Sequence, residues 1–314
     1  MSVPNLESPR KAVLIKIILI AALVCAAIAT VLMLRREFER PPVIATWVWD
    51  TESLMKDRSD LLDFAEDQGV NVIFLHVDRK SEDFAPYRAF VEEAHELGME
   101  VEALGGDPTW GLTEYRREID SFIEWLEDYR EAAGEWAAFD GIHVDIEPYL
   151  LEEWERERDE IVRQWMGNMA YLVDRMKPHA SLRISADLPF WIHKVPTREN
   201  VSLGAWMLER LDRVVLMNYR NFAVGENGII DNALPMIKEG TKAGKPVIIG
   251  LETAPTDEGE HVTFYGQGTA GMHRQMQLSH RFMRRYSGYG GFSIHDFKSW
   301  REASESGRQE GREG

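Results

Sequence analysis

Short apolar runs recur along the chain, and each is followed by residues whose apolar positions repeat at helical spacing. The clearest runs are 43–48, 72–75, 214–217 and 247–251. Continuous apolar runs of this length are typical of parallel strands that helices cover on both faces. With the shorter runs included, the pattern predicts eight strands, at residues 43–49, 71–76, 101–104, 140–147, 182–186, 214–217, 246–253 and 290–296. Eight strands alternating with helices predict an α/β fold, a (β/α)8 TIM barrel.

Polar or aromatic residues stand at the carboxyl ends of nearly all these strands. Barrels of this type build their sites at that end, from residues that the strands deliver to one face. We therefore expect substrate-binding residues among Trp49, Trp110, Asp187, Trp191, Asn218, Tyr219, Glu252 and His295. Trp110 belongs to a turn-rich loop, 105–110, which predicts an exposed ring.

The fourth predicted strand carries the densest chemistry. Ile142, Val144 and Ile146 alternate with His143, Asp145 and Glu147 in the run from Asp140 to Glu147. In a strand, this alternation places three aliphatic side chains on one face and three ionisable side chains on the other. Inside a barrel the ionisable face points into the lumen, where buried carboxylates are costly unless they are paired or used in chemistry.

A long apolar segment precedes the barrel. Residues 12–34 are apolar apart from Lys16 near the start, and the segment is long enough to span a bilayer. A cleaved signal peptide is the alternative, because Ala27-Ile28-Ala29 offers a small-x-small site, but the apolar run continues to Leu34, which favours an uncleaved anchor. Cys25, the only cysteine, lies within this segment. We expect a single-pass membrane protein with its barrel outside the cytoplasm.

The predicted organisation is a flank at 1–11, a transmembrane anchor at 12–34, a linker at 35–42, a barrel at 43–303 and a disordered tail at 304–314. Six of the 36 basic and three of the 53 acidic residues lie in the first 40, which leaves 30 basic and 50 acidic residues, a net charge of −20. Such a charge repels nucleic acid, so neither DNA nor RNA is an expected partner.

The fourth strand resembles the signature of glycoside hydrolase family 18, the chitinase-like barrels, which reads Asp-Gly-x-Asp-x-Asp-x-Glu. Asp140, Gly141, Asp145 and Glu147 match it, and His143 replaces the middle Asp. Met217-Asn218-Tyr219 is similar to the family's Met-x-Tyr on strand six. The resemblance extends in order over roughly residues 43–300.

This resemblance implies a glycan substrate with β-linked N-acetylhexosamine units. We expect no cofactor, and no metal either, because no third His stands near His76 and His143 at close spacing. It implies that Glu147 is the general acid and that Asp145 orients the substrate's acetamido group, which attacks the anomeric carbon in place of a protein nucleophile. Tyr219 would hold the acetamido oxygen. Asp140 and His143 would contribute to substrate binding. Arg220 stands where the chitinases carry an Asp, and His295 replaces the tryptophan that floors their sugar site.

Three other interpretations stay open. Glu147-Pro148 together with Glu252 resembles the acid/base and nucleophile of retaining double-displacement glycosidases, although Ile146 stands where that group has Asn. The pairs His76/Asp78 and His143/Asp145 could ligate a hydrolytic metal. Finally, the changes at His143, Arg220 and His295 are compatible with an inactive glycan-binding barrel.

Overall fold

The computed structural model describes residues 42–51, 57–134, 137–179 and 181–313, together with Ile15, Lys16, Ile18, Leu19 and Ala22. The chain divides into two compact units, Met1–Pro42 and Val43–Gly314. The second unit contains all eight strands of the barrel.

Eight parallel strands close into a barrel in chain order, β1 to β8, with β8 paired to β1. Their bounds are β1 Val43–Val48, β2 Val72–His76, β3 Glu100–Gly105, β4 Gly141–Val144, β5 Arg183–Pro189, β6 Arg213–Met217, β7 Val247–Glu252 and β8 Tyr289–His295. The predicted (β/α)8 barrel is therefore confirmed.

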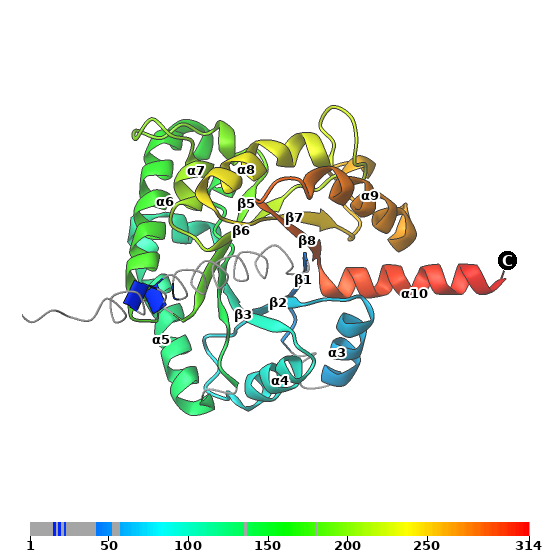
Figure 1. Cartoon of the computed structure of the whole chain (residues 1–314), viewed down its shortest axis with the longest axis horizontal. Coiled ribbons are helices and arrows are strands. Elements are labelled where there is room, and N and C mark those ends of the chain that lie inside the picture. Colours follow the sequence, from blue (N-terminus) through cyan, green and yellow to red (C-terminus); the bar gives the residue numbers. More distant parts are fainter. Residues whose placement is uncertain are drawn as a thin grey trace, which may run out of the picture. The chain divides into compact units, whose positions relative to one another are not determined.

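Helices alternate with the strands and surround them (Figure 1). They are α3 Arg58–Asp67, α4 Ala85–Glu96, α5 Arg116–Ala133, α6 Trp154–Met176, α7 Leu203–Leu208, α8 Ile229–Ala243, α9 Gly268–Met283 and α10 Phe297–Glu313. The longest, α6, follows β4 directly after a short 3-10 turn, Pro148–Leu150.

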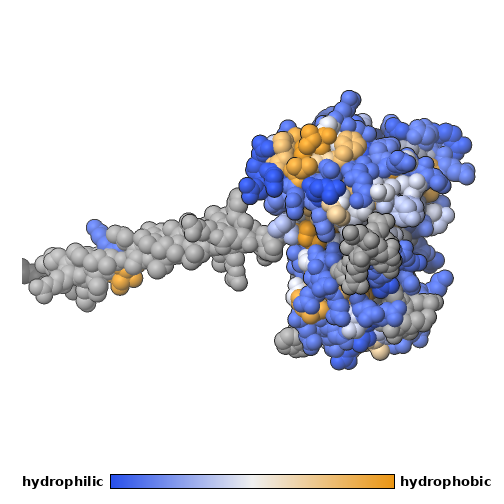
Figure 2. Space-filling view, turned by 90° about the vertical axis from the view of Figure 1, so that its right-hand side faces the viewer, coloured by the Kyte–Doolittle hydropathy of each residue, from blue (hydrophilic) through white to orange (hydrophobic). Residues whose placement is uncertain are grey.

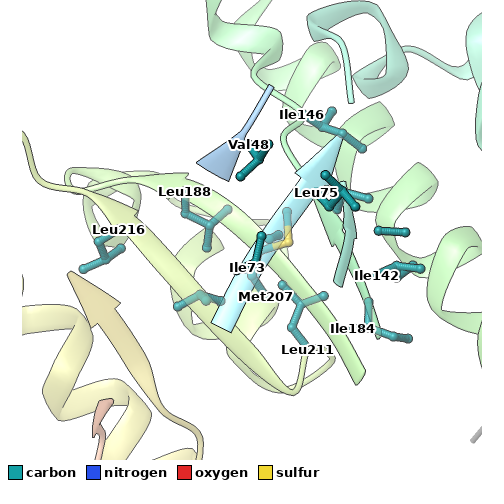
Figure 3. Packing of buried hydrophobic residues seen from close by; sticks show 14 of the residues in the cluster. Val48, Ile73, Leu75, Ile142, Ile146, Ile184, Leu188, Met207, Leu211 and Leu216 are labelled. Atoms are coloured by element: carbon teal, nitrogen blue, oxygen red, sulfur yellow. The ribbon is translucent and has the colours of Figure 1, made fainter. Parts of the chain in front are cut away.

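Two apolar cores result from the alternation of side chains along the strands. Ile73 and Leu75 point outward into a large core between the strands and the helices (Figure 3). Val72 and Phe74, from the same strand, point inward to a smaller core that fills the lumen with Trp47 and Leu104. Inward polar residues in the middle of the strands, such as Glu102, His143 and Ser185, are therefore enclosed by protein.

The strand segments agree with the sequence predictions to within one or two residues at most ends. Two differences bear on the site, because β4 ends at Val144, ahead of Asp145 and Glu147, whereas β5 continues to Pro189 and includes Asp187. At the other end of the chain, α10 continues to Glu313 through the segment 304–314, where the composition predicts a disordered tail.

The predicted flank (1–11), anchor (12–34) and linker (35–42) lie outside the described residues, apart from Pro42 and the five residues of the first unit named above. Those five residues are helical and exposed. Among the described residues no helix combines the length and apolar character needed to cross a bilayer.

The barrel unit presents a mostly hydrophilic surface on the side shown in Figure 2, with one larger hydrophobic patch. Exposed large apolar side chains of this unit include Leu150, Val224, Tyr265 and Leu278. Hydrophilic residues dominate that surface, as expected for a chain with many acidic side chains, which are stable in contact with solvent.

Candidate active site

Six of the predicted site residues meet at the carboxyl end of the barrel, delivered by five consecutive strands, β4 to β8. They are Asp145, Glu147, Asp187, Tyr219, Glu252 and His295. Tyr219 lies close enough to the four carboxyl groups to feel their charges. Its pKa is raised well above the ordinary value, mainly by burial and further by the negative charges of Asp187, Glu252, Asp145 and Glu147. The phenol therefore stays protonated and can donate a hydrogen bond.

The backbone after β4 places the acidic pair. Ile142, Val144 and Ile146 are at most 2% exposed and belong to the outer core, while His143 is fully buried. The alternation predicted from the sequence thus persists beyond the last ladder hydrogen bond of the strand. Gly106 makes room for the turn, because a Cβ at that position would lie 2.0 Å from the carbonyl oxygen of Asp145.

Glu147 accepts a hydrogen bond from the hydroxyl of Tyr149. Burial raises the pKa of Glu147, and the negative charge of Asp187 adds to the rise, against the opposing effects of the Tyr149 hydrogen bond and the charge of His295. A carboxyl group with a raised pKa keeps its proton closer to neutral pH, which a general acid requires.

Asp145 lies deeper than Glu147. Burial raises its pKa well above the ordinary value, and the charges of Asp187 and Glu147 raise it further, while His295 opposes them. Its Oδ1 atom is buried without a hydrogen-bond partner among the described residues. A buried polar atom of this kind is costly while it has no partner, which makes Oδ1 of Asp145 a candidate for contact with a ligand.

Glu252 and His295 form a pair on the opposite side of the lumen. His295 Nδ1 lies 2.8 Å from Glu252 Oε2, and Glu252 Oε1 accepts from the backbone amides of Thr253 and Ala254, each at 2.7 Å. Burial disfavours the imidazolium, but the hydrogen bond and charge of Glu252 outweigh it and raise the pKa of His295. Both oxygens of Glu252 are therefore engaged.

Two of the predicted aromatic residues line this region. Trp49 is half-buried, donates from Nε1 to His295 Nε2 at 3.3 Å, and has its ring centroid 5.8 Å from that of His76. Trp191 is also half-buried and contacts Tyr149, with ring centroids 5.1 Å apart. Both rings lie next to site residues and offer partly exposed stacking surfaces.

Four predicted site residues, Asp140, Asn218, Trp110 and His143, make their contacts within the protein and away from the acidic pair. Asp140 precedes β4, at the amino end of the barrel, where its Oδ2 accepts from the Val101 amide at 2.7 Å and lies 2.9 Å from His95 Nε2. Asn218 is fully buried and donates to the carbonyl of Ile229 at 2.8 Å, which fastens the segment after β6 to α8. These contacts show structural roles for both residues.

The expectation of an exposed ring at Trp110 is wrong, because this side chain is 3% exposed and packs on Phe122 with a centroid distance of 5.9 Å. The guanidinium of Arg79 covers it at 4.8 Å. His143 is also enclosed, stacked on Phe74 at 3.8 Å beneath Asp187. It can act on a substrate only through Asp187.

Sequence reasoning missed three residues of the site. Tyr149 contacts Glu147, Trp47 donates from Nε1 to Asp187 Oδ2 at 2.9 Å, and Ser185 lies 2.6 Å from His143 Nδ1. The signal for Ser185 was present, since Ser185 and Asp187 alternate with apolar neighbours as His143 and Asp145 do. No comparable pattern marks Tyr149, because a 3-10 turn returns it to Glu147.

Among the described residues no three His, Cys, Asp or Glu side chains gather in an arrangement that could hold a metal. Arg220, which stands where the resembling chitinases carry an Asp, donates to the backbone carbonyls of Tyr219 and Asn227 and lies over Phe190 at 5.1 Å. Its guanidinium therefore secures the loop after β6.

Fold and site together define a parallel (β/α)8 barrel with an acidic cluster at the carboxyl ends of its strands. No protein-family model matches the sequence, and no curated protein matches it either. Solved structures do match the fold. A chitinase from Bacteroides thetaiotaomicron aligns with a TM-score of 0.53 at 13% identity, covering 83% of this chain and 91% of that one.

Two further structures are similar. A mutant class V chitinase from Nicotiana tobaccum in complex with NAG4 has a TM-score of 0.51 at 11% identity, over 84% of this chain and 99% of that one. YKL-39, solved in the presence of chitooligosaccharides, has a TM-score of 0.53 at 10% identity, over 84% and 98%. At these identities the likeness shows the fold, a barrel of the chitinase type. The resemblance to the chitinase-like barrels, first noted from the residues of the fourth strand, is thereby confirmed at the level of the fold.

Proposed function

We propose that this protein is a glycoside hydrolase that cleaves glycans containing β-linked N-acetylhexosamine by substrate-assisted retention. The observation that carries the proposal is the acidic pair Asp145 and Glu147, both partly buried at the carboxyl end of the barrel with raised pKa values and close to a protonated Tyr219. The chitinase-type fold, including a neighbour solved with NAG4, supports the choice of substrate.

Each residue has one task in the proposed reaction. Glu147 donates its proton to the glycosidic oxygen as the bond to the anomeric carbon breaks. The acetamido oxygen of the substrate attacks that carbon, and Asp145, whose Oδ1 has no partner among the described residues, accepts the acetamido N–H. Tyr219 donates to the acetamido oxygen. Water then attacks the anomeric carbon of the cyclised intermediate, with Glu147 as the base.

The state of Glu252 favours this reaction over double displacement. A protein nucleophile needs a free carboxylate oxygen directed at the anomeric carbon. Glu252 instead accepts two backbone amides with one oxygen and pairs with His295 through the other. An attack by Glu252 would require breaking these contacts.

The test compares the full-length chain with Glu147→Gln on a panel of β-linked N-acetylhexosamine oligomers. We expect turnover by the native chain and a loss of ~10²–10⁴-fold in Glu147→Gln with binding retained. Glu152→Gln, an exposed change five residues away, is the matched control and should keep full activity. A thiazoline inhibitor, which mimics the cyclised intermediate, should compete.

Three results would contradict the proposal in different ways. Binding without turnover in the native chain would indicate a glycan-binding barrel. Turnover that the thiazoline does not inhibit would indicate double displacement. Absence of both binding and turnover across the panel would remove N-acetylhexosamine glycans as the substrate class.

We also propose that residues 12–34 hold the barrel at a membrane, outside the cytoplasm. The support is the length of the apolar segment in the sequence. Alkaline extraction of membranes should leave the full-length chain in the pellet and release a variant that lacks these residues. Release of the intact full-length chain would argue for peripheral attachment, and release of a shortened chain would argue for a cleaved leader.

A further inference from the structure

A chain of hydrogen bonds runs down the lumen beneath the acidic pair. It begins with Asp187, whose Oδ2 lies 2.9 Å from Trp47 Nε1 and 2.8 Å from His143 Nε2. His143 Nδ1 lies 2.6 Å from Ser185 Oγ, Ser185 contacts Glu102 Oε2, and Glu102 Oε1 accepts from Arg213 Nη2 at 2.6 Å. None of these side chains is more than 4% exposed.

The lower end of this chain fixes the direction of its hydrogen bonds. Glu102 is paired with Arg213 and has Arg183 Nη1 at 3.4 Å from the same oxygen, so it is a carboxylate and can only accept. Ser185 therefore uses its single proton toward Glu102. Its oxygen is left to accept, which places a proton on His143 Nδ1.

One proton is then shared between His143 Nε2 and Asp187 Oδ2. The indole N–H of Trp47 can only donate, so Trp47 accepts a proton neither from His143 nor from Asp187. Either His143 is neutral and Asp187 is a protonated acid, or His143 is an imidazolium and Asp187 a carboxylate. The choice sets the charge directly below Asp145.

Burial favours the neutral pair, because separating charge in this enclosed place costs free energy. Burial lowers the pKa of His143 to about 3, with Glu102 opposing and Arg213 adding to the fall. Burial raises the pKa of Asp187 to about 7, with the Trp47 hydrogen bond and the charge of His295 opposing. Asp187 Oδ1 is moreover buried without a partner among the described residues, which costs less for a neutral acid than for a carboxylate.

We propose that Asp187 is held as a neutral carboxylic acid by His143, and that this neutral state allows Asp145 to ionise while Glu147 keeps its proton. Asp187 is thus a positioning residue for the reaction, and this role rests on the proposed function. An ionised Asp187 would raise the pKa of Asp145, since after burial its charge is the largest influence there. The titratable groups that face the same cluster are Glu147, Tyr149, Tyr219, Glu252 and His295.

The proton can be located without any substrate. In mildly acidic buffer, the full-length chain labelled with ¹⁵N-histidine should show His143 with Nδ1 protonated and Nε2 bare, and infrared spectra should show the C=O stretch of a buried protonated acid. In Asp187→Asn one buried-acid band should be lost while the band of the protonated Glu147 remains, and the histidine signals should be absent in His143→Gln. An imidazolium with both nitrogens protonated would overturn the proposal, as would buried-acid bands that are unchanged in Asp187→Asn.

Ser185 provides a second test. Ser185→Ala removes the acceptor of His143 Nδ1, so signal from an Nε2-protonated tautomer should appear, and Ser185→Thr should restore the original signal. An unchanged tautomer of His143 in Ser185→Ala would contradict the proposed chain of hydrogen bonds. If Asp187→Asn does not fold, the histidine spectrum of the native chain still decides between the neutral pair and the ion pair.

The effect of Asp187 on catalysis is tested by a separate measurement, the pH dependence of kcat/KM. Residue 187 cannot ionise in Asp187→Asn, so its negative charge no longer raises the pKa of Glu147 at higher pH, and the alkaline limb of kcat/KM should move to lower pH than in the native chain. A limb at the same pH would show that the charge of Asp187 does not control the acidic pair. If no glycosidase substrate is found, the proposed function is contradicted, but the protonation states of Asp187 and His143 from the spectra still stand.

Discussion

The hydroxyl of Tyr149 donates a hydrogen bond to Oε2 of Glu147, two residues earlier in the chain. This hydrogen bond favours the ionised carboxylate and lowers the pKa of Glu147, against the larger effect of burial. The two largest influences on the pKa of Glu147, burial and the Tyr149 hydrogen bond, therefore oppose each other, and only the hydrogen bond can be removed by a substitution that keeps the site closed.

Tyr149→Phe should raise the pKa of Glu147. Without this hydrogen bond the ionised carboxylate loses a stabilising contact, while burial and the charge of Asp187 continue to raise the pKa. Because Glu147 acts in its protonated form, the alkaline limb of kcat/KM should move to higher pH. Tyr171→Phe, which removes a hydrogen bond to Asp120 at 2.6 Å far from the site, is the control. A limb that moves to lower pH would contradict this assignment.

The pair Glu252 and His295 allows a second prediction. Glu252→Gln removes the charge that raises the pKa of His295, so His295 becomes neutral at lower pH and no longer lowers the pKa values of Asp145 and Glu147. The expected result is a roughly tenfold loss of kcat, because Asp145 must ionise for the reaction and its pKa rises. The exposed Glu258→Gln is the control. Complete inactivation, with rescue of Glu252→Ala by azide, would instead identify Glu252 as a nucleophile.

Gly106 lies against the backbone of Asp145, and its replacement tests how far the acidic pair depends on that contact. In Gly106→Ala the new Cβ would lie 2.0 Å from the Asp145 carbonyl oxygen, so the turn that carries the pair must shift. Both kcat and the thermal midpoint should fall. Gly98→Ala is matched, since Gly98 has φ of +76° with nothing within 4 Å, and should cost about 1–2 kcal/mol without changing kcat. Equal kcat in both variants would show that the turn tolerates displacement.

Most of the barrel could be predicted because a parallel strand buried on both faces leaves a continuous apolar run, as in β1 and β7. Position relative to a strand's carboxyl end similarly predicted Asp145, Glu147, Asp187, Tyr219, Glu252 and His295 as neighbours. What the sequence does not encode locally is the partner of a side chain at a strand's amino end or in a turn. Asp140, at the start of β4, and Trp110, in a turn that folds onto Phe122, were misplaced for that reason.

Asp140 should therefore matter for stability and not for turnover. Asp140→Asn weakens the contact with His95 and the acceptance of the Val101 amide, which fasten the amino end of β4 to β3 and α4. We expect a loss of about 1–3 kcal/mol, and the thermal midpoint should fall by about 2–4 °C for each kcal/mol. The kcat measured well below that midpoint should be unchanged. A lower kcat with an unchanged midpoint would return Asp140 to the substrate site.

The ion pair of Glu102 and Arg213 supports the lumen from below, and breaking it should be more damaging than removing it entirely. Arg213→Met leaves the fully buried Glu102 with only Arg183 Nη1, at 3.4 Å, as a cationic partner. An uncompensated buried charge costs about 3–5 kcal/mol, so the urea midpoint of Arg213→Met should fall accordingly. The double variant Glu102→Leu/Arg213→Met removes both charges and should recover part of that loss. If the double variant is less stable than Arg213→Met, the hydrogen bond from Ser185 to Glu102, and not the charge of Arg213, is the main contribution of Glu102 to the fold.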